Sequence, residues 1–194
     1  MNTGEVGSYG VLGSAGSWSH DAAAKAYPDA ERIGLPSFDA IAEGVVKGEF
    51  DIAVFPVCNS ITGPIPRVAG IIAQHELRTI HQLTLPIHHC LVGPQAMAGA
   101  MPDTDLPIKI YSHPQGFLQC SNYLETTFSN AEYIEVSDTA SGIKQVANST
   151  SEADLAIGSA FAASLYGGIV LKEAINNDRE NATTFSFCRT STDG

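Results

Sequence analysis

Short apolar runs alternate with helical segments along the chain, and this alternation limits the fold more than any other feature. An apolar run at 9–13 precedes an alanine-rich stretch at 21–27, which favours a helix because alanine has the highest helix propensity. A second run at 32–35 leads to Ser37, a predicted N-cap, and the run at 51–57 is apolar on both faces. This β-α-β-α-β order predicts an α/β fold with an open sheet covered by helices on both sides.

The second half of the chain repeats the strand–helix theme. The predicted strands and helices span residues 108–112, 115–127, 132–136, 139–147, 154–157, 159–165, 168–172 and 183–189, and a long apolar run at 83–92 precedes them. The run at 83–92 is long enough to cross from one lobe to another. The pattern therefore predicts two lobes around a polar cleft, with residues 1–84 and 174–194 in one lobe and 85–173 in the other.

The formal net charge of −11 excludes several classes of partner. An acidic surface repels phosphate backbones and anionic lipids, which argues against a nucleic-acid or membrane partner. The four cysteines lack the spacing of a zinc or disulfide framework, and the adjacent His88 and His89 would point to opposite faces of a strand. With no apolar run of membrane-spanning length, we expect a cytoplasmic protein with free thiols and no metal.

Five short motifs lie at predicted strand ends or helix caps. In chain order they cover residues 13–23 (GSAGSWSHDAA), 56–63 (PVCNSITG), 113–120 (HPQGFLQC), 138–142 (DTASG) and 181–185 (NATTF). Taken together and in this order, they resemble the motifs of prephenate dehydratases over nearly the whole chain.

The resemblance implies a fold like that of the type II periplasmic-binding proteins, with two α/β lobes and the active site in the interlobe cleft. It also implies a lyase that removes carbon dioxide and water from prephenate, a small dicarboxylate, and forms phenylpyruvate without a cofactor. The family's regulatory ACT domain is not expected in this chain. A homodimer is the default assembly.

The resemblance also implies the site residues. Thr183 is the implied catalytic hydroxyl, with Asn59 and Ser60 beside it, because a departing hydroxyl needs a donor on its oxygen. The implied substrate-binding residues are Ser19, His20, Cys58, Gln115, Thr139, Ala140, Thr184 and Phe185. Gln119, one helical turn after Gln115, is expected to face the cleft with it. For the serines and Thr139, helix capping is an alternative role that is compatible with anion binding.

Three residues depart from the family's motifs. Thr184 stands where the family has an Arg that would clamp a substrate carboxylate, and a Thr offers at most one neutral donor. Cys58 and His20 each replace a Glu. We hypothesise that the changes at Cys58 and Thr184 are linked, because loss of the cation would leave the carboxylate unpaired. The candidates for a replacement cation are His20, Arg67, Lys109 and Arg189.

Three functions stay open on these residues. Retention of Thr183 favours dehydration of prephenate or a close analogue. The missing Arg favours a different reaction on a related cyclohexadienyl acid in specialised metabolism, such as prephenate decarboxylation without aromatisation or a step towards a tropone-type product. A non-catalytic small-molecule binding module with the same fold is the third alternative.

Overall fold

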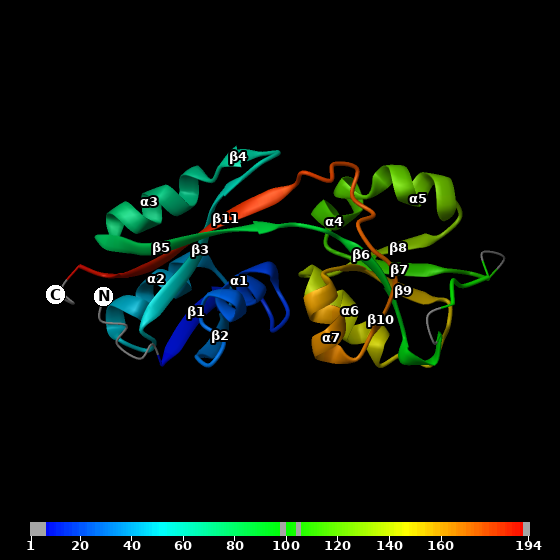
Figure 1. The fold of residues 1–194 in the computed structure, drawn as a ribbon, viewed down its shortest axis with the longest axis horizontal. Coiled ribbons are helices and arrows are strands. Elements are labelled where there is room, and N and C mark those ends of the chain that lie inside the picture. The colour runs from blue at the N-terminus through cyan, green and yellow to red at the C-terminus, as the bar shows by residue number, and fades with distance from the viewer. Residues whose placement is uncertain (1–6, 98–99, 104–105, 192–194) are drawn as a thin grey trace. The chain divides into compact units, whose positions relative to one another are not determined.

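The chain divides into two units, each with its own sheet. A computed structural model describes residues 7–97, 100–103 and 106–191 (Figure 1). The first unit contains the described residues up to Pro86 and from Asn181 onward, and the second runs from Ile87 to Glu180. Within the described ranges, no helix has the length and apolar character needed to cross a membrane.

The first unit is a mixed sheet with helices packed on it. Its elements are β1 (Ser8–Leu12), α1 (Trp18–Ala26), β2 (Glu31–Leu35), α2 (Phe38–Lys47), β3 (Ile52–Asn59), β4 (Gly63–Pro64), α3 (Pro66–Gln74), β5 (Leu77–Pro86) and β11 (Ala182–Thr190). The parallel pairing of β1 with β2 and β3 confirms the predicted β-α-β-α-β opening. The return strand β11 lies antiparallel between β3 and β5, as Figure 1 shows, so the sheet order is β2-β1-β3-β11-β5.

Helix α2 illustrates how the local sequence sets an element. Ser37 is its N-cap, as predicted, and its side chain accepts a hydrogen bond from the backbone N–H of Ala40 at 3.1 Å. Gly48 ends the helix in a left-handed conformation with φ of 71°, which glycine adopts without steric cost. Between the caps, Ile41 and Val45 are buried in the cluster that also contains Phe55 of β3.

The sequence pattern predicted neither α3 nor the true course of β5. Helix α3 starts at Pro66 without a side-chain cap, and residues 78–82 of β5 are exposed, so they lack the apolar alternation of a half-buried strand. The apolar run at 83–92 is not one continuous element: β5 ends at Pro86 and a new strand begins at Cys90. The chain passes from the first unit to the second between Pro86 and Ile87, within this run.

The second unit has helices on both faces of its sheet, which has the order β10-β6-β9-β7-β8. Its elements are β6 (Cys90–Gly93), η1 (Gln95–Met97), β7 (Lys109–Ser112), α4 (Pro114–Gln119), α5 (Ser121–Thr127), β8 (Glu132–Glu135), α6 (Thr139–Ala147), β9 (Asp154–Gly158), α7 (Ala160–Tyr166) and β10 (Ile169–Lys172). Successive strand residues serve opposite faces: Ile110 packs with Leu124 of α5, and Tyr111 packs with Ile143 of α6.

The contacts of Asn177 explain two differences between the predicted boundaries and the structure. The predicted helix at 115–127 is two helices that meet at Cys120. Asn177 bonds across this junction: its backbone N–H donates to the Gln119 carbonyl at 2.7 Å, and its side chain donates to the Leu118 carbonyl at 3.2 Å. Residues 174–180 therefore belong to the second unit, whereas the sequence pattern placed them in the first lobe.

The contact of Gly10 and Gly44 with the Phe50 ring yields a stability prediction. A Cβ at either glycine would overlap this buried ring. We expect Gly10→Ala to destabilise the protein by about 1–3 kcal/mol, the usual cost of overpacking. Gly70→Ala is the control, because a Cβ there meets nothing within 4 Å and alanine stabilises a helix interior by about 0.5–1 kcal/mol. Urea unfolding measures both, and equal midpoints for the two variants would contradict this expectation.

Candidate active site

Asn59 and Thr183 face each other where β3 and β11 pair. The two residues are directly opposed in the antiparallel register, so their side chains share one face of the sheet. The Asn59 amide nitrogen lies 3.0 Å from the Thr183 hydroxyl oxygen, 2.9 Å from the Asn181 side-chain oxygen and 3.1 Å from the Ala182 carbonyl. Thr183 is partly exposed. The structure thus brings together two of the three residues that the motifs implied as catalytic.

The orientation of the Asn59 amide follows from its other contacts. Its side-chain oxygen accepts backbone N–H bonds from Ile61 at 3.0 Å and Thr62 at 3.2 Å. These donors fix the oxygen on their side, so the NH₂ group must face Thr183. The Thr183 oxygen therefore accepts a hydrogen bond, and its own proton can be donated elsewhere.

Ser60, the third implied catalytic residue, ties the same strand ends together. Its backbone N–H donates to the Ala182 carbonyl at 2.8 Å, and its hydroxyl accepts from the Ala182 N–H at 2.9 Å. Asn181, which was not among the implied site residues, is 1% exposed and holds the Asn59 amide. Its place at the start of the NATTF motif is the sequence signal that could have found it.

Cys58 and Thr184 are also directly opposed, one residue further along the two strands. Their side chains therefore share the other face of the sheet, with Cβ atoms about 4.5–5.5 Å apart in such pairs. The Thr184 hydroxyl bonds to that of Thr84 at 2.9 Å. The hypothesis of linked changes at 58 and 184 required neighbouring positions, and the register provides them.

Helix α1 carries Ser19 and His20 just after β1. Ser19 is 5% exposed, so it offers little surface to a ligand. The His20 Nδ1 accepts the backbone N–H of Gly16 at 2.7 Å, which requires that nitrogen to be unprotonated. Burial, assisted by the nearby Arg32 charge and opposed by Asp21, lowers the pKa of His20 below its usual value. His20 is therefore a neutral imidazole at pH 7, and its proposed role as replacement cation is wrong.

The lowered pKa of His20 predicts a pH dependence of stability. An unfolded His binds a proton below about pH 6.5, whereas the folded one resists it, so stability falls as the pH drops through this range. We expect His20→Asn to lose less stability than the wild type on going from about pH 7.5 to about pH 5.5. Burial also lowers the pKa of His89, so part of the acid loss persists in both proteins. Urea unfolding at both pH values checks this, and identical losses would contradict it.

The other candidate cations have positions of their own. Arg67 pairs with Asp39 at 2.6 Å on the surface of the first unit. Arg189 lies near the C-terminal end of β11, away from Thr184, and stands opposite Arg78 of β5. Lys109 belongs to the second unit, 4.0 Å from Glu132. In the first unit, neither arginine stands at the Thr184 position.

Two of the implied substrate-binding residues have their side chains in the core. Phe185 is 2% exposed and Ala140 is fully buried in the cluster beneath α6. Each follows a motif threonine, and the next residue in a strand or helix points in a different direction. Neither side chain has the accessible surface that contact with a ligand requires.

In the second unit, Gln115 and Thr139 lie at one edge of the sheet. They belong to the first turns of α4 and α6, which follow the parallel strands β7 and β8. A Cβ at Gly116 would lie 3.4 Å from the Thr139 methyl carbon, so the two first turns are neighbours. Asp138 caps α6 by accepting the Ser141 N–H at 2.7 Å, which leaves Thr139 outside the cap.

Gln119 does not continue the polar surface of Gln115. Its side-chain oxygen bonds to Nε2 of the buried His89 at 2.9 Å. The expectation that both glutamines face a ligand is wrong for Gln119, because the buried imidazole needs a polar partner.

The three buried cysteines lack the features of catalytic thiols. Burial raises the pKa of the Cys120 thiol to about 12 and also raises those of Cys90 and Cys188. A raised pKa keeps a thiol in its unreactive protonated form. Over the described ranges, no group of three His, Cys, Asp or Glu side chains is placed to hold a metal ion.

Comparison with known proteins decides the family. A family model described as prephenate dehydratase matches residues 9–192. The chain belongs to the prephenate dehydratase family. A solved prephenate dehydratase from Arthrobacter aurescens, crystallised with L-Phe, shares the fold with a TM-score of 0.81 and 26% identity, over 94% of this chain and 60% of that one.

Curated members of the prephenate dehydratase family are longer than this chain. Arogenate dehydratase 3 of Arabidopsis thaliana is 35% identical over 173 residues, which cover 89% of this chain and 40% of that protein. Arogenate dehydratase/prephenate dehydratase 6 from the same plant is also 35% identical, over 89% of this chain and 41% of its own length. The chain thus spans about two fifths of the length of these relatives.

Proposed function

We propose that this chain is a lyase of aromatic amino acid biosynthesis that decarboxylates and dehydrates prephenate or its amino analogue arogenate. The observation that carries the proposal is the Asn59–Thr183 hydrogen bond of 3.0 Å. It directs the threonine hydroxyl as a donor, which is what a departing hydroxyl requires. The names of the similar plant enzymes support both substrates.

The proposed reaction balances without an added oxidant or reductant. The bond between the ring and its carboxylate breaks, and carbon dioxide leaves. The electron pair of that bond moves into the ring and expels the hydroxyl at the opposite carbon. The expelled oxygen takes one proton and becomes water, and the ring becomes aromatic. Prephenate then yields phenylpyruvate, and arogenate yields phenylalanine.

Thr183 acts in this proposal as a hydrogen-bond donor to the departing oxygen. An alcohol is too weak an acid to be ionised at pH 7, so the group works by stabilising charge that develops on the oxygen. The Asn59 amide strengthens this donor, because a hydroxyl that accepts one hydrogen bond is a better donor of another. Ser60 holds the β3 and β11 ends in register and keeps this geometry in place.

The Cys58–Thr184 pair favours a second candidate. Where the family motifs have a Glu and an Arg, this chain has two neutral side chains opposite each other. Loss of a charged carboxylate clamp favours an altered cyclohexadienyl acid, or decarboxylation without aromatisation. Retention of Thr183 makes dehydration the leading proposal.

The purified chain with prephenate and, separately, with arogenate tests the proposal. Ultraviolet absorbance and product mass distinguish the outcomes. Phenylpyruvate or phenylalanine supports the dehydratase, and a decarboxylated product that keeps its hydroxyl supports the second candidate. Saturable binding of both acids without turnover would overturn both reactions and leave a binding module.

A further inference from the structure

We propose that the second unit carries a binding site for a small organic carboxylate with an apolar body, between α5 and the segment that follows β10. A pocket of about 310 Å³ opens there. Small-molecule sites start near this size, at about 300 Å³. Its residues are Asn122, Tyr123, Thr126, Lys172, Ala174, Ile175, Asn176, Asn177 and Arg179, and none of them belongs to the candidate active site.

The charges of this pocket favour an anion. Lys172 and Arg179 are its charged lining residues, and no acidic side chain of the described residues lines it. Within the described part of the chain, neither cation takes part in an ion pair. The acidic residues beside these cations in the sequence, Glu173, Asp178 and Glu180, do not line the pocket, so the charges that a bound ligand meets there are positive.

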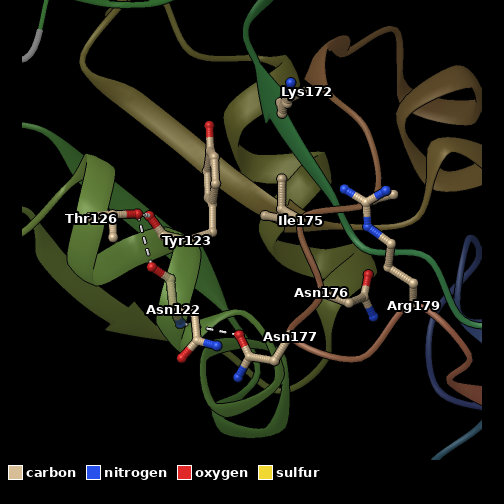
Figure 2. A pocket seen from close by; sticks show the side chains of 9 residues that line it. Asn122, Tyr123, Thr126, Lys172, Ile175, Asn176, Asn177 and Arg179 are labelled. Atoms are coloured by element: carbon tan, nitrogen blue, oxygen red, sulfur yellow. Dashed lines mark hydrogen bonds between the residues drawn. The ribbon is translucent and has the colours of Figure 1, made fainter.

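The apolar lining of the pocket, formed by Tyr123 and Ile175, indicates that the ligand also carries an apolar group. Figure 2 shows the Tyr123 ring across from Ile175, with Lys172 and Arg179 on the side of the segment that carries Ile175. Burial raises the pKa of the Tyr123 phenol, so the ring stays neutral at pH 7. A flat or branched apolar group between Tyr123 and Ile175 would place a carboxylate within reach of the cations, and an inorganic anion would leave this apolar lining unused.

Two asparagines hold the pocket in a preformed state. The buried Asn176 accepts the His89 N–H at 2.6 Å and donates to the Ile87 carbonyl at 2.8 Å. Asn177 accepts the Asn122 N–H at 3.1 Å and donates to the Ser121 hydroxyl at 3.0 Å. The Asn177 bonds join the segment after β10 to the start of α5, and the Asn176 bonds join it to the residues before β6, so little ordering would oppose binding.

Titration of the whole chain with 3-phenylpropanoate tests the site. Backbone amide NMR reports where it binds, and calorimetry reports how tightly. We expect saturable shifts at Asn122, Tyr123 and Asn177, and weaker binding at high salt. Lys172→Gln and Arg179→Gln should each weaken binding about tenfold, as expected for loss of one charge-assisted contact. Lys144→Gln, on α6 of the same unit, is the control of equal charge change and should bind like the wild type.

Three results would overturn the proposal. One is the absence of saturable shifts at the pocket amides. Another is equal affinity for 3-phenylpropanoate in the two pocket variants and the Lys144→Gln control. The third is binding of inorganic phosphate, or of the uncharged 3-phenylpropanamide, as tight as that of the carboxylate. Tight phosphate binding would show that the site needs no apolar group on its ligand, and tight amide binding would show that it needs no negative charge. Because this readout is binding in the second unit, its failure leaves the proposed reaction untouched, and loss of turnover leaves this site untouched.

Discussion

Replacement of Thr183 by alanine is expected to lower kcat by at least about two orders of magnitude, the usual cost of removing one oriented donor from developing charge. The fold should survive. The Asn59 amide has two hydrogens, and without the threonine hydroxyl it still has the Asn181 and Ala182 oxygens as acceptors. The amide therefore keeps its partners, and the stability change should stay near the roughly 1 kcal/mol range of strand propensities. Turnover of prephenate and arogenate, with urea unfolding in parallel, measures both.

Two further variants separate the hydroxyl from its orientation. Thr183→Ser keeps the donor and should stay within about tenfold of the wild-type kcat. Asn59→Asp keeps the shape but replaces the NH₂ group by an oxygen, so the Thr183 proton must turn towards the new carboxylate rather than towards the substrate. This variant should therefore lose kcat as Thr183→Ala does. Wild-type turnover in the alanine variant would show that the hydroxyl has no part in the reaction.

Local patterns in the sequence predicted the elements and their caps well. The alternation of apolar runs identified β1, β2 and β3, and Ser37 is the N-cap of α2, as expected of serine before an apolar helix. These features depend on residues close together in the sequence. The position of β11 between β3 and β5 depends on pairing across most of the chain, which no local period encodes.

The same distinction applies to the site. The motifs named Asn59, Ser60 and Thr183, but only the register brings them together and shows that the Asn59 amide turns the hydroxyl into a donor. The motifs alone did not show that the side chains of Phe185 and Ala140 lie in the core. The role of Asn177 in splitting α4 from α5 required a contact between segments more than fifty residues apart, since it caps the Leu118 and Gln119 carbonyls.

The second large effect is expected from restoring the charged pair of the family motif at Cys58 and Thr184. Cys58→Glu alone places a carboxylate at a half-buried position without a cation opposite, which should destabilise the protein by about 1–3 kcal/mol. Thr184→Arg alone removes the Thr84–Thr184 hydrogen bond of 2.9 Å and places a long side chain at a half-buried position of β11, with a cost of about 1 kcal/mol. In the double variant the two charges face each other across the β3–β11 pair.

The hypothesis that the changes at Cys58 and Thr184 are linked predicts that the stability effects of Cys58→Glu and Thr184→Arg are not additive. The double variant should be more stable than the sum of the single effects by about 1–3 kcal/mol, the coupling typical of contacting residues. Cys58→Ser with Thr184→Arg is the neutral control and should be additive within about 0.5 kcal/mol. Urea unfolding of the wild type, the single variants Cys58→Glu, Cys58→Ser and Thr184→Arg, and the two double variants gives both coupling energies. Additive stability effects in the Glu–Arg variant would mean that the two substitutions are unrelated. In that case, a lower KM for the dicarboxylate in Thr184→Arg alone would assign the missing carboxylate clamp to position 184 by itself.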